Sequence, residues 1–285
     1  MAGSSSRAVV CPECGRLVAA SEPVCPFCGA SRPAGGGVDG LLRALFGLPF
    51  EYVVIAVCAT LYLLSLALDP SAIAVRGGLF GVLAPSPRSL LALGGSGALP
   101  VFGLGRWWTV LSATWLHGGL IHVLFNMLWV RQLAPAVAGA YGAARTALIF
   151  VGSGVCGFLL SSFMGAWFGG LPSFLRGATL TIGASASIFG LLGAVVYFGR
   201  RHGFGAAARQ AWTWALVLFV MGLLMPGVDN YAHLGGFLGG YLGARLLAPT
   251  RPESRTDRLA AALALFASLA AVLWSFFDTA TLAGL

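Results

Sequence analysis

The sequence has very little charge and contains no lysine. Charged residues make up 9% of its 285 residues, hydrophobic residues make up 58%, and the mean hydropathy is +0.87. A soluble domain carries about 25% charged residues, so this composition excludes an ordinary soluble protein and predicts an integral membrane protein. All 17 basic side chains are arginine, and they lie mostly between apolar runs instead of on one face. The formal charge of +8 therefore does not predict a nucleic-acid partner.

The N-terminal region also lacks a secretory signal. Residues 1–40 are polar, glycine-rich and cysteine-bearing, the reverse of the apolar core of a cleavable signal peptide. We interpret the seven apolar segments that follow as membrane spans. They are Phe50–Leu68, Leu116–Ala138, Ala143–Met164, Ser185–Gly199, Trp212–Met225, Ala232–Leu247 and Leu259–Phe277.

The distribution of arginine orients these spans. With the N-terminus in the cytoplasm, four of the 17 arginines fall on the outer side and the others on the cytoplasmic side. The four are Arg76, Arg88, Arg106 and Arg176. Arginine is enriched in cytoplasmic loops, so we expect a multi-pass protein in the lipid bilayer of the cell inner membrane, with a cytoplasmic N-terminus.

Two C-P-x-C-G motifs lie near the N-terminus. The first contains Cys11 and Cys14, the second contains Cys25 and Cys28, and ten residues separate Cys14 from Cys25. Four thiolates at this spacing can close a tetrahedral Zn²⁺ site, so we expect a structural zinc ribbon at residues 1–33 that takes no part in catalysis. Two disulfides are the alternative. We expect the ribbon to be a regulatory module or to bind a cytoplasmic partner, with a flexible linker at 34–47.

A serine without an evident structural role lies in the apolar run 183–190. A helix from Ser185 to Gly199 would be about 22 Å long, against a hydrocarbon core of about 30 Å, so Ser185 would lie below the membrane surface. The glycine-rich segment 165–183 before it suggests an aqueous pocket open to the outside. An ordinary span over 175–197, with the Ser185 hydroxyl bonded to a preceding carbonyl, is the alternative.

A histidine near the start of a later apolar segment, His233, is a candidate base for this serine. Glycines that allow close helix packing follow it, namely Gly235, Gly239 and Gly243, with Gly236 and Gly240 beside them. Packing of these glycines against Gly190 and Gly193 would bring His233 within hydrogen-bond reach of Ser185. Asp229 is better placed as a helix N-cap, so we expect a Ser–His dyad and no triad.

Two further polar residues, His122 and Asn126, share one helix face because they stand four apart. Polar side chains are costly inside a bilayer, and two donors on one face suit an oxyanion hole. Interhelical hydrogen bonding is the alternative for each. We expect His117 to support a loop. Arg106, which precedes two tryptophans, is interpreted as an interfacial residue and a candidate for holding the long outer loop.

Taken in order, these motifs resemble those of the rhomboid intramembrane serine proteases over about residues 48–248. The matching positions are Arg106, Thr109, His117, His122 and Asn126, then Gly183 and Ser185, then Ala232 to Gly236. The resemblance implies an all-α polytopic membrane fold with a six-helix core, here followed by a seventh transmembrane helix within 249–285. It implies Ser185 as nucleophile, His233 as general base, and His122, Asn126 and the Ser185 N–H as oxyanion donors. It also implies that transmembrane-helix substrates are cut near the outer membrane face without a catalytic cofactor.

The chain departs from the family pattern at three places. Ala186 stands where the family usually has glycine, Gly105 stands where tryptophan often precedes the loop arginine, and Ala134–Ala138 lacks a common Gly-x-x-x-Glu pattern. None of these removes a catalytic side chain, so an active protease is favoured over an inactive rhomboid-fold protein that binds membrane clients and recruits partners through its ribbon. A small-molecule transporter is disfavoured because no inverted pair of broken helices appears in the sequence.

Overall fold

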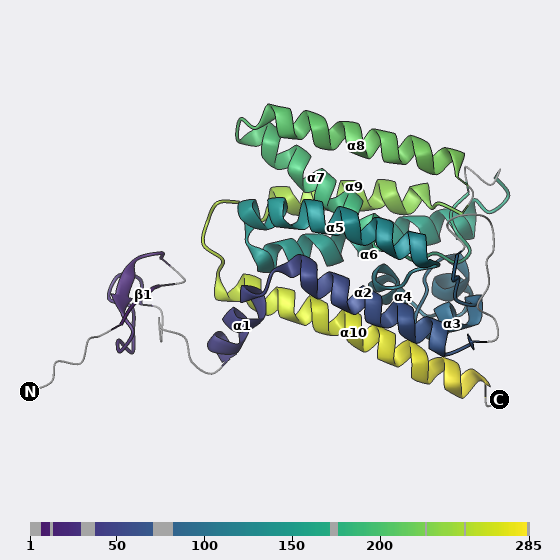
Figure 1. Ribbon diagram of the computed structural model, residues 1–285, viewed down its shortest axis with the longest axis horizontal. Helices are drawn as coiled ribbons and strands as arrows, with labels where there is room; N and C mark the ends of the chain where they lie inside the picture. The colour runs from purple at the N-terminus through teal and green to yellow at the C-terminus, as the bar shows by residue number, and fades with distance from the viewer. Residues whose placement is uncertain are drawn as a thin grey trace, which may run out of the picture.

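The computed structural model describes residues 7–11, 14–29, 38–70, 82–171, 176–225, 227–247 and 249–283. Over these residues the chain forms a small two-stranded unit followed by a bundle of helices (Figure 1). The long helices are α2 (Phe50–Ala67), α5 (Leu120–Tyr141), α6 (Ala143–Trp167), α7 (Ser185–Arg201), α8 (Gly205–Leu224), α9 (Asn230–Leu246) and α10 (Arg255–Ala283). The short elements are α1 (Val38–Gly47), α3 (Pro87–Ala92), η3 (Leu99–Gly103), α4 (Thr109–Ser112) and η4 (Ala113–Trp115).

Each apolar segment predicted as a span overlaps one of the long helices. By length and composition, five helices within the described ranges could cross a membrane, namely α2, α5, α6, α8 and α10. Helices α7 and α9 have 17 residues each, about 25 Å against a hydrocarbon core of about 30 Å. The protein is therefore an all-α polytopic membrane protein in which the helices carrying Ser185 and His233 are the two short ones. The predicted helix start at Ser185 is confirmed.

Several boundaries differ from the sequence-based prediction. Helix α8 begins at Gly205 instead of Trp212 and is not short, because alanine, arginine and glutamine are good helix formers, although Arg209 and Gln210 lower the hydropathy of this segment. Helix α5 begins at Leu120 instead of Leu116, because the backbone of Gly119 is extended. Helix α10 is longer than predicted at both ends.

Part of the predicted linker is a helix. Residues 34–37 lie outside the described residues, but 38–47 form α1, so the prediction of a flexible linker is wrong there. The apolar residues of this segment recur with helical spacing and bury Leu42 where α1 contacts α10 and α6. Helix α1 therefore packs against the bundle.

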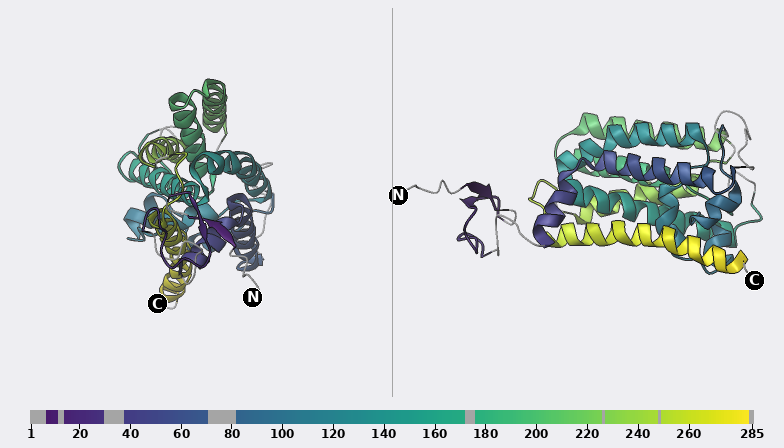
Figure 2. Two further views of the ribbon diagram at one scale, coloured as in Figure 1. Left: turned by 90° about the vertical axis from the view of Figure 1, so that its left-hand side faces the viewer. Right: turned by 60° about the horizontal axis from the view of Figure 1, so that its bottom comes forward.

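The N-terminal unit contains two short antiparallel strands, β1 (Ala8–Val10) and β2 (Leu17–Ala19), with Val9 opposite Val18. This unit lies beyond one end of the bundle, whereas α3, α4 and the last turns of α10 lie toward the other end (Figures 1 and 2). The chain thus places its cysteine-bearing module far from the helix ends that hold the polar motifs.

Helix α9 packs tightly against both α6 and α7 through its glycines. Gly236 and Gly240 face α7, and a Cβ at Gly240 would collide with the backbone of Gly190. Gly235 and Gly239 face α6, where a Cβ at either would lie less than 3.0 Å from α6 atoms. The predicted close packing of α9 on α7 is confirmed for Gly236 and Gly240, but the prediction is wrong for Gly235 and Gly239, which pack on α6. Side chains as small as hydrogen let these helices approach to backbone contact.

We expect Gly240→Ala to destabilise the protein by about 1–3 kcal/mol, because its methyl must push α9 away from Gly190. Gly243→Ala is the matched control, since a Cβ at Gly243 would meet nothing nearer than an Ile149 atom at 4.0 Å. Thermal unfolding in detergent micelles measures both effects. Equal destabilisation by the two substitutions would show that the Gly240 contact does not limit helix approach.

Candidate active site

The backbone before α7 is shaped by one glycine. Gly183 has a φ of +124°, a conformation that glycine adopts at little cost. Its N–H donates a hydrogen bond to the carbonyl of Ala113 at 2.9 Å. A Cβ at Gly183 would also lie 2.9 Å from Nε2 of His122. Glycine is therefore required here both by its backbone angle and by the ring packed against it.

Ser185 and His233 come together at the start of α7 and the first turn of α9. The Nε2 atom of His233 lies 3.0 Å from the Oγ atom of Ser185, as the glycine seam predicts. The His233 ring stacks on Phe189, with ring centroids 4.2 Å apart, and only 6% of His233 is exposed. Ser185 is half-buried. The hydroxyl thus bonds to a shielded imidazole, and the serine itself is partly exposed.

Among the described residues, no carboxylate accepts a hydrogen bond from His233. The Nδ1 atom of His233 has no hydrogen-bond partner in the described part of the chain. Asp229 instead caps α9, because its Oδ1 accepts the Ala232 N–H at 3.0 Å, and its Oδ2 accepts the Ser161 hydroxyl. Burial raises the pKa of the Asp229 carboxyl, and these hydrogen bonds oppose that rise. The expected N-cap is confirmed, and the geometry is that of a serine–histidine pair.

His122 presents a donor toward the serine. Its Nδ1 accepts the Gly118 N–H at 3.2 Å, so in the neutral ring the hydrogen is on Nε2. The Nε2 side of the ring packs against Gly183, two residues from Ser185. The Asn126 amide nitrogen donates to the His122 carbonyl at 2.8 Å, which uses one of its two hydrogens. His122 is therefore directed at the serine turn, whereas Asn126 is engaged with its own helix.

The remaining polar residues surround this pair. His117 is fully buried in the loop before α5, with its ring centroid 5.1 Å from that of His122. Burial, and secondly the nearby His122, lowers the pKa of His117 well below its usual value. Ser187 is bonded to Thr114, with their hydroxyl oxygens 2.8 Å apart. The Ser187 hydroxyl is thus bonded to Thr114, and His117 lies in the loop beside His122.

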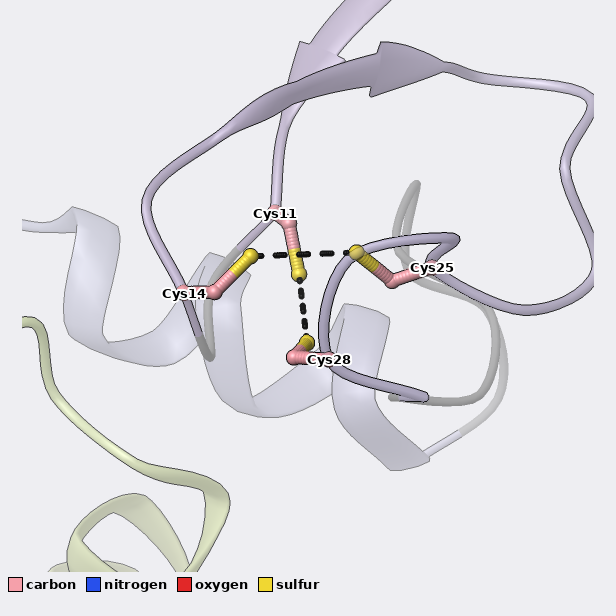
Figure 3. A group of neighbouring side chains, drawn as sticks. All are labelled: Cys11, Cys14, Cys25 and Cys28. Atoms are coloured by element: carbon pink, nitrogen blue, oxygen red, sulfur yellow. Dashed lines mark hydrogen bonds between the residues drawn. The ribbon is translucent and has the colours of Figure 1, made fainter.

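The four N-terminal cysteines form a second cluster (Figure 3). Their sulfur atoms all lie within 4.8 Å of one another, and the pairs Cys11–Cys28 and Cys14–Cys25 are 3.7 Å apart. None of the six cysteines, all of which lie in described residues, forms a disulfide, and sulfur atoms 3.7 Å apart are well beyond the S–S bond length of about 2.05 Å, so the structure does not support the disulfide alternative. A tetrahedral zinc site with Zn–S bonds of about 2.3 Å has sulfur atoms about 3.8 Å apart, so the cluster fits this metal.

The protonation of one cysteine also suits metal binding. Burial raises the pKa of Cys25, but hydrogen bonds from the backbone of Phe27 and Cys28 outweigh this effect and lower the pKa to about 7. The thiolate is the form that binds a metal. The backbone around Cys25 therefore favours its thiolate, the form that binds a metal, near neutral pH.

The fold and these contacts define a polytopic membrane protein with a buried serine–histidine pair. A model of the rhomboid domain matches residues 104–250, just over half of the chain. The chain belongs to the rhomboid family.

Relatives support this assignment. RHOMBOID-like protein 2 of Arabidopsis thaliana is 35% identical over 165 residues, which cover 56% of this chain and 47% of that protein. RHOMBOID-like protein 4 of the same plant is 34% identical over 160 residues, covering 55% and 38%. Rhomboid protease GluP of Bacillus subtilis is 29% identical over 169 residues, covering 57% and 30%. The chain thus spans less than half the length of each of these relatives.

Two residues at or near this site were not singled out in the sequence. Phe189, which stacks on His233, stands one helical turn after Ser185, and this spacing of an aromatic was a usable signal. Asp278 forms an ion pair with Arg106, with 2.9 Å between the Arg106 Nε and Asp278 Oδ2 atoms. A carboxylate near the end of an otherwise apolar span was the signal for Asp278.

The departures from the family pattern have local explanations. Gly105 has a φ of +68°, which disfavours any side chain at that position. Ala134 is fully buried in the main hydrophobic core. The methyl of Ala186 is buried with Phe158 and Ala232, between α6, α7 and α9. It therefore fills the helix seam.

We expect Ala186→Gly to leave the rate of Ser185 modification within about twofold of wild type, because the lost methyl lies in the seam. The free energy of unfolding should fall by about 1 kcal/mol, since glycine is a poorer helix former and leaves a small void. Labelling kinetics with a serine-reactive fluorophosphonate, together with thermal unfolding, measure the two effects. A clear rise in the labelling rate would show that the methyl obstructs the serine.

Proposed function

We propose that this protein is an intramembrane serine endopeptidase in which Ser185 and His233 form the catalytic dyad. The observation that carries the proposal is the 3.0 Å contact between the Ser185 hydroxyl and His233 Nε2. It occurs in a chain of the rhomboid family that is similar to a protein named as a protease. A serine activated by an adjacent imidazole is the standard requirement for covalent acyl transfer.

The proposed reaction begins when His233 Nε2 takes the proton of the Ser185 hydroxyl. The alkoxide attacks a peptide carbonyl, and the negative charge on the carbonyl oxygen is held by the Nε2–H of His122, by the second amide hydrogen of Asn126, which the bond to the His122 carbonyl leaves available, and by the Ser185 N–H. That N–H is at the first turn of α7, where backbone donors are free and the helix dipole is favourable. His233 then gives the proton to the leaving amine, and water releases the acyl group.

The proposed substrate is a transmembrane helix that unwinds near its end. Peptide carbonyls inside a helix already accept hydrogen bonds, so a segment must leave the helical form before Ser185 can attack it. Helix α8 is the least buried of the candidate spans, with 22% of its apolar window buried. An apolar cavity of about 180 Å³ between α8 and the α7–α9 pair is lined by Phe189, His233, Phe219 and others. These features favour entry past α8.

We place the dyad toward the outer face of the cell inner membrane and the N-terminus in the cytoplasm. The arginine distribution supports this orientation, since only four of the 17 arginines fall on the proposed outer side. The N-terminal module and the α3–α4 end lie at opposite ends of the bundle (Figure 2). Cleavage near the outer face and a cytoplasmic module are compatible with that arrangement.

We further propose that the four N-terminal cysteines hold a structural Zn²⁺ ion, and that the ribbon contacts a cytoplasmic partner. The support for the metal is the sulfur cluster described above. Four protein ligands leave no open position on the metal, so the ion would stabilise the fold of the ribbon and supply no chemistry to the dyad.

Fluorophosphonate labelling tests the proposed dyad. Wild type in proteoliposomes should be labelled covalently, whereas Ser185→Ala and His233→Ala should lose the signal, by about 10³-fold or more. Ser187→Ala is the matched control, because Ser187 is bonded to Thr114 and should not be needed. If wild type is labelled no more than Ser185→Ala, the protease proposal fails, and a client-binding role without hydrolysis gains support.

Metal analysis tests the proposed ribbon. The purified full-length chain should contain about one equivalent of zinc, and Cys28→Ser should lose most of it because three ligands bind far more weakly. Cys156→Ser, which removes a thiol on α6, is the control and should keep the metal. Less than about half an equivalent in wild type under reducing conditions would contradict the zinc site.

A further inference from the structure

The last helix makes a dense set of polar contacts with one buried arginine. Arg106 is 3% exposed, and its Nε lies 2.9 Å from Oδ2 of Asp278 on α10. Its Nη2 donates to the Ser275 carbonyl at 2.8 Å and to the Thr279 hydroxyl at 2.9 Å, also on α10. Its Nη1 donates to the Leu91 carbonyl at 3.0 Å, near the end of α3. Three of these four contacts come from the C-terminal part of α10.

Two residues near Arg106, namely Trp108 and Gly94, also contact α10. The indole Nε1 of Trp108 donates to the Ser275 hydroxyl at 2.9 Å, and its ring lies 6.1 Å from that of Trp274. Gly94 packs so closely that a Cβ there would lie 2.7 Å from the Ser275 hydroxyl. The Ser112 hydroxyl donates to the Gly94 carbonyl at 2.7 Å. The C-terminal part of α10 therefore packs against, and hydrogen-bonds with, the loop around Arg106 that leads into α4.

Arg106 in turn determines where α4 begins. The Thr109 hydroxyl donates to the Arg106 carbonyl at 2.8 Å, and the Thr109 N–H donates to the same carbonyl at 3.1 Å. These two bonds start α4, which continues directly into η4. The position of Arg106 therefore sets the position of both turns.

The turn η4 touches the backbone that presents the serine. The carbonyl of Ala113 accepts the Gly183 N–H at 2.9 Å, two residues before Ser185. Thr114 bonds to Ser187, two residues after Ser185, with their hydroxyl oxygens 2.8 Å apart. The segment that carries Ser185 is thus held from both sides by η4.

We propose that Asp278 is a positioning residue for Ser185, acting through Arg106, α4 and η4. Without its carboxylate the buried Arg106 cation loses its counter-charge, and α10 loses an anchor on the loop. The loop can then shift relative to α7, and displacements of about 1 Å at a reacting group can cost about 100-fold in rate. This inference rests on the proposed protease function.

Labelling kinetics of the full-length protein in proteoliposomes test this role. Asp278→Asn should lower the maximal rate constant of fluorophosphonate labelling about 10-fold or more, with little change in the half-saturating concentration. Asp278→Glu should recover part of the rate, because it restores the charge.

Asp257→Asn is the matched control. Asp257 lies at the other end of α10 and pairs with the buried Arg145, with 2.7 Å between Arg145 Nη2 and Asp257 Oδ2. The Asp257→Asn substitution should lower thermal stability yet leave the labelling rate within about twofold of wild type.

Three outcomes would overturn the positioning role. One is an unchanged rate for Asp278→Asn, and another is equal slowing by Asp278→Asn and Asp257→Asn at equal loss of stability. If Asp278→Asn does not fold, Asp278→Glu keeps the charge but displaces the carboxylate from Arg106 by one methylene, so it should still slow labelling in part, and an unchanged rate for Asp278→Glu is the third. If wild type is not labelled, the proposed protease function fails first. If wild type is labelled and the Asp278 variants behave as wild type, only the positioning role fails.

Discussion

Backbone contact between α9 and its two neighbours is the constraint on which the rest of the structure depends. Lipid tails are as apolar as leucine, so burial of apolar surface gives membrane helices little reason to associate, and close packing must supply the attraction. Gly236 and Gly240 bring α9 onto α7, while Gly235 and Gly239 bring it onto α6. The ring of His233, about one turn before this seam, is thereby placed 3.0 Å from the Ser185 hydroxyl. The serine–histidine distance is set by backbones that cannot approach further.

The same packing explains how the histidine is held without an acid. Its ring stacks on Phe189, and no described residue bonds its Nδ1 atom. Asp229 is used instead to cap α9 and to bond Ser161 on α6. Because the Ala178 N–H donates to the Ser161 hydroxyl, this carboxylate also ties the loop before α7 to the two helices. The orientation of the imidazole therefore comes from stacking and helix position, and the acid stabilises the frame around it.

Much of this site could be predicted because its information is local. A start at Ser185, the four-residue spacing of His122 and Asn126, the N-cap at Asp229 and the spacing of the glycines along α9 all follow from short-range rules about helices. The predictions that failed, and the contact that was missed, concern less evident patterns and contacts between distant parts of the chain. The first two turns of α8 were missed because their polar residues lower the local hydropathy. The prediction of a flexible linker overlooked the helical spacing of the apolar residues in α1. The pairing of Arg106 with Asp278 joins residues far apart in sequence, so it depends on where α10 packs.

The placement of α10 shows why such long-range pairs matter in a membrane. Only 28% of the apolar window of α10 is buried, so most of its surface would be equally well solvated by lipid in many positions. Near each end, however, a carboxylate meets a buried arginine: Asp257 with Arg145, and Asp278 with Arg106. Buried charges tolerate few alternative partners, because an unpaired ion in a low-dielectric setting is costly. The two pairs therefore specify the register of α10, which apolar packing alone leaves open, and one of them does so beside the turns that hold Ser185.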